Sequence, residues 1–241
     1  MSVKYKRCIL KFSGEILKDG DVGDAISFRV IGALCEEIKS LNDAGFELGI
    51  VIGGGNIFRG AAAHRSLGCD RVAGDYIGML ATTINSMAIG DCLEKLGVGA
   101  VVLSSLPMPD FCEPYYPRRA QKAIGEGTVL LLAGGTGRAF FSTDSAAALR
   151  ASELCADVVV KATKVDGVYD KDPKKYGDAK KFDRISFQEI LARRLSVMDS
   201  TAFSLCMDND IPVIIVDAER DLKNIGRVLR GESLGTTIAN Y

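Results

Sequence analysis

The chain has 241 residues but only one histidine, His64. Zinc sites rich in histidine are therefore excluded, and a Ser-His-Asp triad would depend on this single residue. His64 stands in a short polar stretch, where a solvated surface histidine is the favoured interpretation. Zinc-centred and triad-based chemistry are both disfavoured.

Cysteine pairs at the spacing of metal or redox motifs are also missing. Seven cysteines are scattered along the chain, and no two form a C-x-x-C pair. No signal peptide precedes the first strand-like segment, so we expect reduced thiols and a cytoplasmic protein. No apolar run approaches the roughly 18 residues that a membrane-spanning helix needs, so we expect no membrane partner.

The chain shows no excess of charge of either sign. Thirty lysines and arginines stand against 31 aspartates and glutamates, which gives a formal net charge of −1. The overall field offers no reason for binding a polyanion, and no helix-turn-helix pattern is present. We therefore expect no nucleic-acid partner, although a local cluster of a few cations could still bind a nucleotide.

What the chain does contain is an alternation of short apolar runs and longer helical patterns, with 47% hydrophobic residues. This alternation predicts an α/β fold, a three-layer α/β/α sandwich with a largely parallel central sheet. The predicted strands are Cys8–Phe12, Leu48–Ile52, Ala100–Ser104, Val129–Ala133, Val158–Lys161 and Val213–Val216. The predicted helices are Ser27–Ala44, Asp75–Leu96, Arg118–Gly125, Thr143–Cys155, Phe187–Arg194, Ser200–Asn209 and Leu222–Arg230.

The organisation favours one domain over residues 1–241, with a soft internal boundary near Ala156. The polar segment Tyr169–Ile185 interrupts the alternation and is interpreted as a hairpin, a flexible flap or a solvated loop. The part up to residue 156 and the part from residue 157 are expected to be two halves of the same domain.

Three glycine-rich turns follow predicted strands: Lys11–Glu15, Gly53–Gly60 and Gly134–Ala146. Ligands of open α/β sheets bind at the carboxyl ends of the strands, so these turns are predicted to converge on one cleft. Glycines let backbone N–H groups approach phosphate oxygens, and a helix that begins after the turn adds its positive dipole end. One such turn alone would more often be a tight connection, but three with adjacent cations favour a phosphate site.

Two common nucleotide-binding motifs do not fit these turns. The string G-x-x-x-x-G-K-[ST] of a Walker A loop is absent. The third glycine of a Rossmann fingerprint is replaced by Phe58 after the second turn and by Phe140 after the third. A P-loop enzyme and a dinucleotide-binding protein are therefore both disfavoured.

The motifs resemble those of the bacterial-type uridylate (UMP) kinases of the amino acid kinase superfamily. The similarity extends in order from about Tyr5 to Thr237, and the glycine-rich parts are shared with carbamate, glutamate and aspartate kinases. The matching strings are Lys11–Glu15, Val51–Gly60, Gly74–Thr82, Thr136–Ala147, Lys161–Tyr169, Asp172-Pro173 and Val197–Asp199. The resemblance implies an ATP-dependent nucleoside monophosphate kinase that converts UMP to UDP in pyrimidine nucleotide biosynthesis.

The resemblance also implies roles for the phosphate-transfer residues. Lys11, Arg59 and Asp144 would be catalytic: Lys11 would stabilise charge on the transferring phosphoryl group, Arg59 would bridge donor and acceptor phosphates, and Asp144 would orient Lys11 or help position Mg²⁺. Lys161 could reach the ATP phosphates or be merely solvated, and Asp199 is a candidate second carboxylate. The ATP-binding set is Lys11, Phe12, Ser13, Gly14, Gly55, Arg59, Thr163, Tyr169 and Asp172.

On the acceptor side, the resemblance implies that residues 1–156 mainly bind UMP and that residues 157–241 mainly bind ATP. Asp75 would accept hydrogen bonds from the ribose hydroxyls, although it could simply be a helix N-cap. Phe140 and Phe141 could flank the base or belong to the core. The UMP-binding set is Gly54, Asp75, Thr136, Gly137, Arg138, Ala139, Phe140, Phe141, Ser142 and Thr143.

Cofactors and partners follow from the same resemblance. Mg²⁺ would be carried by ATP, with no protein metal ligand assigned. The family implies a homohexamer, and the apolar helix around Met79–Leu93 is a candidate interface that could equally be ordinary core packing. UTP is expected as a feedback inhibitor. The stretch Lys18–Asp24 is short and acidic where many members have a glycine-rich segment, which argues against activation by GTP.

Two rival functions stay open at this point. A superfamily kinase that phosphorylates a carboxylate or carbamate would explain Lys11 and the glycine turns, but not Asp75 or the Thr136–Asp144 string. A non-catalytic nucleotide sensor is disfavoured because Lys11, Arg59 and Asp144 occur together.

Overall fold

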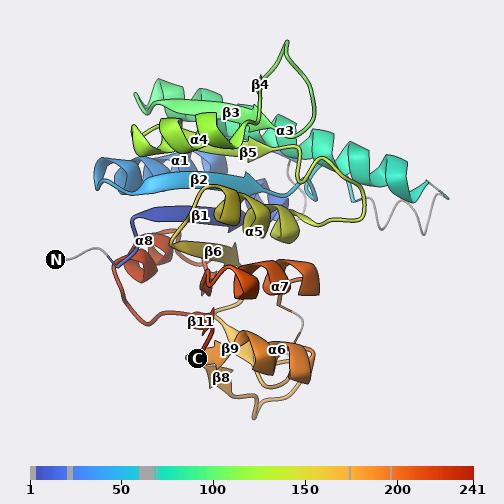
Figure 1. Cartoon of the computed structure of the whole chain (residues 1–241), viewed down its shortest axis with the longest axis vertical. Coiled ribbons are helices and arrows are strands. Elements are labelled where there is room, and N and C mark those ends of the chain that lie inside the picture. Colours follow the sequence, from blue (N-terminus) through green and yellow to red (C-terminus); the bar gives the residue numbers. More distant parts are fainter. Residues whose placement is uncertain (1–3, 21–23, 60–67, 69, 174, 196) are drawn as a thin grey trace.

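The computed structural model describes residues 4–20, 24–59, 68, 70–173, 175–195 and 197–241. A nine-stranded sheet forms its centre, in the order β4-β3-β5-β2-β1-β6-β10-β11-β9 (Figure 1). Neighbouring strands in this sheet are parallel except for the antiparallel pair β10 and β11. The strands are β1 (Arg7–Phe12), β2 (Glu47–Ile52), β3 (Ala100–Ser104), β4 (Glu113–Pro114), β5 (Val129–Ala133), β6 (Val158–Thr163), β9 (Arg184–Ser186), β10 (Val213–Asp217) and β11 (Thr236–Ala239).

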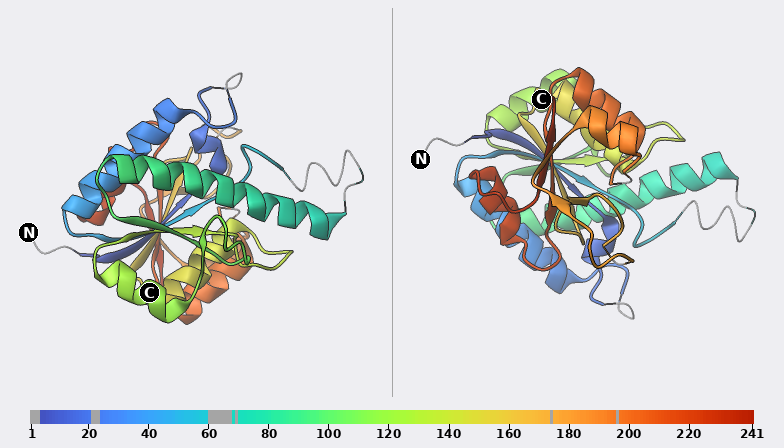
Figure 2. Two further views of the ribbon diagram at one scale, coloured as in Figure 1. Left: turned by 90° about the horizontal axis from the view of Figure 1, so that it is seen from above. Right: turned by 90° about the horizontal axis from the view of Figure 1, so that it is seen from below.

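Helices cover both faces of this sheet, which confirms the predicted three-layer α/β/α sandwich (Figure 2). On one face α1 (Phe28–Asp43), α3 (Arg71–Lys95) and α8 (Lys223–Leu229) pack against residues such as Leu10 and Ile50. The other face carries α4 (Pro117–Gly125), α5 (Thr143–Glu153), α6 (Phe187–Arg193) and α7 (Ser200–Asp208).

The six predicted strands are all present, and each is a short, largely apolar run. Strands β2, β5 and β10 are buried along their whole length. Continuous apolar runs of this kind are typical of parallel strands covered on both faces. The sheet therefore places the carboxyl ends of β1, β2, β5 and β6 at one edge, where the predicted turns begin.

The polar segment Tyr169–Ile185 forms a hairpin, one of its three predicted interpretations. Strands β7 (Val168–Tyr169) and β8 (Lys181–Phe182) pair antiparallel as a separate two-stranded sheet. Strands β4, β9 and β11 were not predicted, since runs of two to four residues carry too little periodicity.

Helix α3 is the longest helix described, and its first turns project past the carboxyl ends of the strands (Figures 1 and 2). It begins at Arg71, four residues before the predicted start, because the carboxylate of Asp70 accepts a hydrogen bond from the Ala73 N–H at 2.9 Å. Asp75 therefore lies within the helix, and its alternative role as the N-cap is wrong. No helix in the described part of the chain is long and apolar enough to cross a membrane.

Candidate active site

The first two glycine-rich turns touch each other directly. A Cβ atom on Gly14 would lie 2.3 Å from Asn56 Oδ1 and 2.4 Å from the Gly53 carbonyl oxygen, so only glycine fits there. The Gly53 N–H donates to the Phe12 carbonyl at 2.9 Å. A Cβ on Gly53 would stand 3.6 Å from Thr143 Oγ1, at the start of α5. The three turns therefore converge at the carboxyl edge of the sheet, as predicted.

The third turn depends on glycine for its backbone conformation. Gly134, Gly135 and Gly137 have φ values of +73°, +57° and +74°, which side chains other than glycine rarely adopt. The turn ends at Ser142, whose Oγ accepts hydrogen bonds from the N–H groups of Asp144 and Ser145 and so caps α5. The cap fixes where Asp144 enters the site.

Two lysines share the carboxylate of Asp144. Lys11 Nζ lies 2.7 Å from Oδ1, and Lys161 Nζ lies 2.6 Å from Oδ2. Burial would raise the pKa of Asp144, but the charges of Lys11 and Lys161 outweigh it and hold the pKa below its ordinary value. Burial also lowers the pKa of Lys161. The three side chains form a compact cluster that holds one net positive charge when all three are ionised.

Strand register explains this cluster. Lys11 and Lys161 are Cα partners on the neighbouring parallel strands β1 and β6, so their side chains emerge on the same face, toward α5. The Lys161 ammonium also donates to the Val197 carbonyl at 2.6 Å. Asp144 does orient Lys11, in line with one of its two predicted roles. The alternative that Lys161 is merely solvated is wrong.

Asp199 supports the cluster from α7. Its carboxylate accepts hydrogen bonds from the hydroxyls of Ser142 and Ser145, and from the Ala202 N–H at 2.8 Å as the N-cap of α7. The expected second carboxylate is thus engaged by hydroxyls and a backbone amide. This arrangement ties α7 to the start of α5, beside Asp144.

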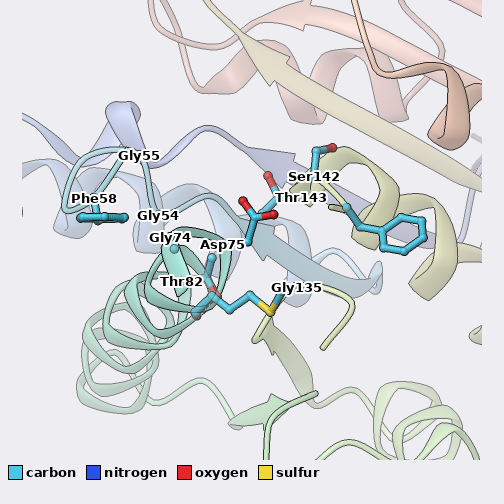
Figure 3. Close-up of a pocket in the computed structure, with 12 residues that line it drawn as sticks. Gly54, Gly55, Phe58, Gly74, Asp75, Thr82, Gly135, Ser142 and Thr143 are labelled. Carbon is cyan, nitrogen blue, oxygen red and sulfur yellow. Dashed lines mark hydrogen bonds between the residues drawn. The ribbon is translucent and has the colours of Figure 1, made fainter. Parts of the chain in front are cut away.

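A cavity of about 150 Å³ lies between the second and third turns, with α3 as one wall (Figure 3). The carboxylate of Asp75 is anchored at its edge by Arg71 Nε at 3.0 Å and by the Phe140 N–H at 2.8 Å. Its lining residues are Gly54, Gly55, Phe58, Gly74, Asp75, Gly78, Met79, Thr82, Gly135, Phe141, Ser142 and Thr143. This set brings together five of the ten residues predicted for UMP and one predicted for ATP, Gly55.

The other predicted acceptor-side residues lie in the same loop but off the cavity wall. These are Thr136, Gly137, Arg138, Ala139 and Phe140. Phe140 is 68% exposed and Phe141 is 48% exposed, so the alternative that they belong to the core is wrong. Phe140 has φ +71° and packs under Arg71, whose Cζ lies 5.6 Å from the ring centroid.

A second cavity, of about 570 Å³, opens beside Lys161. It is lined by Lys161, Thr163, Val165, Gly167, Tyr169, Lys171, Asp172, Pro173, Arg194, Leu195, Val197 and Ile215. The predicted residues Thr163, Tyr169 and Asp172 thus share one wall. The Lys11–Asp144–Lys161 cluster lies next to both cavities, because Lys161 lines the second and Thr143, the neighbour of Asp144 in the chain, lines the first.

Arg59 and the first turn form a separate ion pair. Arg59 Nη2 lies 2.7 Å from Glu15 Oε1, and Lys18 adds a contact at 3.5 Å. Burial opposes ionisation of Glu15, but these cations lower its pKa below the ordinary value. Glu15 had no assigned role in the sequence. The exposed Arg59 side chain is therefore held beside the first turn.

Phe12 and Ser13 differ in what they present. The Phe12 ring is fully buried in the core, so its side chain does not face a nucleotide and only its backbone could. Ser13 is exposed and caps the short helix Gly14–Leu17.

In the described part of the chain, no group of three or more His, Cys, Asp or Glu side chains could hold a metal ion. His64, Gly60 and part of the Lys18–Asp24 stretch lie outside the described residues.

Comparisons with known proteins agree over nearly the whole chain. A model of the amino acid kinase family matches residues 6–217. The fold superposes on a UMP kinase from Bacillus anthracis with a TM-score of 0.93 and 34% identity, covering 98% of this chain and 96% of that one. A UMP kinase from Ureaplasma parvum gives 0.91 and 36%, covering 98% and 99%. A uridylate kinase from Archaeoglobus fulgidus gives 0.73 and 27%, covering 96% and 99%.

Proposed function

This chain belongs to the amino acid kinase family, and we propose that it is a UMP kinase, which transfers the γ-phosphoryl group of ATP to UMP to give UDP and ADP. One observation carries the proposal: the buried Lys11–Asp144–Lys161 cluster lies next to two cavities, with Lys161 lining the larger and Thr143, beside Asp144, lining the smaller. A cation cluster flanked by two sites suits the transfer of a charged group from one ligand to another.

In this proposal the smaller cavity takes UMP and the larger takes ATP. The Asp75 carboxylate would accept hydrogen bonds from the ribose hydroxyls, and the backbone of Gly54 with Ser142 and Thr143 would receive the acceptor phosphate. Thr163, Tyr169 and Asp172 would surround the adenosine of ATP, and Gly14 and Gly55 would approach its phosphates. The division into an acceptor half, residues 1–156, and a donor half, residues 157–241, follows from this assignment.

The chemistry requires no general base. An oxygen of the UMP phosphate is the nucleophile and is already ionised at neutral pH. Lys11 and Lys161 would stabilise the charge that develops on the transferring phosphoryl group, while Asp144 holds both ammonium groups in place. Arg59 would bridge donor and acceptor phosphates from its place beside Glu15.

Mg²⁺ would enter on the phosphate oxygens of ATP. Both oxygens of Asp144 are paired with lysines at 2.7 and 2.6 Å, so the cluster fits phosphate-borne Mg²⁺ better than a metal cage made of protein ligands. When bound, the ion would neutralise phosphate charge and orient the transferring group. The making of UDP would place the enzyme in pyrimidine nucleotide biosynthesis in the cytoplasm, with UTP as a feedback inhibitor.

The proposed homohexamer would use the outer face of α3. Six apolar side chains on this helix, each 37–49% exposed, form the face: Val72, Tyr76, Ile77, Leu80, Ile84 and Met87. Within the expected interface range Met79–Leu93, Met79, Ile89 and Leu93 are buried in the chain itself, as the core-packing alternative expects. Light scattering of the purified protein tests this, and Leu80→Asp with Ile84→Asp should lower the mass.

The decisive experiment measures ADP release from ATP and Mg²⁺ with separate acceptors. UMP, CMP, dUMP, glutamate, aspartate and bicarbonate with ammonia would each be offered. We expect turnover with UMP. Turnover with an amino acid or carbamate instead would overturn the substrate, and UMP binding without any turnover would favour the sensor.

A further inference from the structure

Helix α3 has a buried polar side that the mechanism above does not use. Thr82 is 2% exposed and Asn85 is completely buried. Polar side chains buried to this extent need hydrogen-bond partners, since an unpaired one costs about 1–3 kcal/mol. Their partners identify what these residues do.

Asn85 holds the second glycine turn. Its Nδ2 donates to the Gly53 carbonyl at 2.8 Å and to Asn56 Oδ1 at 2.8 Å. Asn56 returns a hydrogen bond to Asn85 Oδ1 at 3.0 Å and donates to the Ala25 carbonyl at 2.8 Å. Since Gly14 also abuts Asn56 and Gly53, this amide pair backs both of the first two turns.

Thr82 holds the third glycine turn. Its Oγ1 accepts a hydrogen bond from the Gly134 N–H at 2.9 Å and donates to the Met79 carbonyl at 2.7 Å. The hydroxyl proton is thus already committed within the helix. Thr82 and Asn85 are three residues apart on α3, a rise of about 4.5 Å. One rigid helix therefore binds two turns that are far apart in the sequence.

We propose that Thr82 and Asn85 are positioning residues, which fix the separation of the second and third glycine turns and so align the two phosphates for transfer. The alignment of the phosphates rests on the proposed function, whereas the fixed separation of the two turns does not. The second turn lies tight against α3, because a Cβ on Gly54 would be 2.6 Å from the Gly78 carbonyl oxygen. A shift of about 1 Å in such an alignment can cost on the order of 100-fold in rate.

The first test uses two substitutions at one position. Thr82→Val keeps the shape but leaves the Gly134 N–H without its acceptor, whereas Thr82→Ser keeps the hydroxyl. We expect kcat to fall about 10- to 100-fold in Thr82→Val, with the Kd of UMP within about threefold by calorimetry, and Thr82→Ser to stay within about threefold of wild type. Equal kcat values for all three proteins would overturn the proposal.

The second test compares neighbours on the same helix. Asn85→Ala removes the contact with Gly53, while Ser86→Ala removes an equally buried hydroxyl that donates only to the Thr82 carbonyl. Hydrogen–deuterium exchange detects local opening of the backbone in a protein that stays folded, and it can be measured whether or not the protein is catalytically active. Each variant is measured at the same number of degrees below its own melting temperature. We expect faster amide exchange at residues 53–58 in Asn85→Ala but not in Ser86→Ala.

These readouts separate the two proposals. If the wild-type chain phosphorylates no UMP but Asn85→Ala still loosens residues 53–58 selectively, the proposed function fails and the positioning role stands. If wild type turns over UMP while Asn85→Ala and Ser86→Ala show the same exchange and the same kcat, the positioning role fails and the proposed function stands.

Discussion

The two cavities beside the lysine cluster are built in different ways. The smaller is walled by glycine turns and by α3, and buried side chains hold its walls: Asn85 on Gly53 and Thr82 on Gly134. The larger is walled by side chains of strand ends and of the β7–β8 hairpin, and exposed ion pairs such as Lys181–Asp166 and Lys175–Asp172 lie in or beside this hairpin.

This difference bears on tolerance to change. The wall of the smaller cavity leaves no room for added atoms at Gly54, and its geometry depends on buried hydrogen bonds, which contribute more than exposed ones. The exposed ion pairs beside the larger cavity contribute only about 0–1 kcal/mol each. We therefore expect the acceptor side to be sensitive to small substitutions and the donor side to accept them, with the lysine cluster more sensitive than either.

Lys11→Ala should give the largest effect. Loss of its ammonium removes charge stabilisation in the transition state, and we expect kcat to fall about 10²- to 10³-fold while most UMP binding remains. Steady-state ADP release with calorimetric UMP binding measures both quantities. Unchanged turnover would remove Lys11 from the chemistry.

Gly14→Ala tests the close packing of the first glycine turn against the second. The new methyl group would meet Asn56 Oδ1 and the Gly53 carbonyl at under 2.5 Å, and we expect a loss of about 1–3 kcal/mol in unfolding free energy together with a loss of activity. Gly32→Ala is the matched control in α1, where nothing lies within 4 Å, and should stabilise by about 0.5–1 kcal/mol. Chemical denaturation of both variants provides the comparison, and equal stabilities would contradict it.

Asp75→Asn should alter selectivity more than stability. The amide preserves the shape but weakens acceptance of hydrogen bonds from ribose hydroxyls, so we expect the kcat/KM preference for UMP over dUMP to fall about tenfold. Competition assays with both acceptors measure the ratio. A ratio equal to that of wild type would show that Asp75 serves only to hold Arg71 and the Phe140 N–H.

Tyr169→Phe should give the smallest effect. The phenol donates to Asp166 Oδ1 at 2.8 Å in a partly buried pair, and loss of this one hydrogen bond should change the KM for ATP by at most about threefold. Initial rates at varied ATP measure it. A tenfold rise in the KM for ATP would mean that the donor side is as sensitive to small substitutions as the acceptor side.

Sequence reasoning found the strands and the glycine turns because both leave local patterns. The family resemblance gave the pairing of Asp144 with Lys11 as one of two roles for Asp144. It left Lys161 undecided, although Lys11 and Lys161 each sit near the end of a strand followed by a site motif; the deciding fact, that β1 and β6 are neighbours in register, is a property of the sheet. The order of strands in a sheet cannot be predicted from the sequence of any one strand or turn alone.

The roles of Thr82, Asn85 and Asn56 could not have been found in the same way. Each is a polar residue in or beside an apolar pattern, and a polar residue there can face solvent or find a buried partner. The contacts of Asn85 with Gly53 and of Thr82 with Gly134 determine which of these occurs, and the partners are 32 and 52 residues apart in the sequence. The N-cap of α3 was misplaced for a simpler reason, since Asp70 and Asp75 both precede helical sequence.

Because β1 pairs with β6 in a defined register, catalytic activity depends on correct folding of the central strands. A one-residue slip of β1 would turn Lys11 to the opposite face of the sheet, away from Asp144, while leaving the strand hydrogen-bonded. Lys161 and Asp144 would stay as a lone ion pair with no second ammonium. A chain that folds with the wrong register would thus be compact but inactive, so specific activity measures the fraction of molecules whose central strands are correctly aligned.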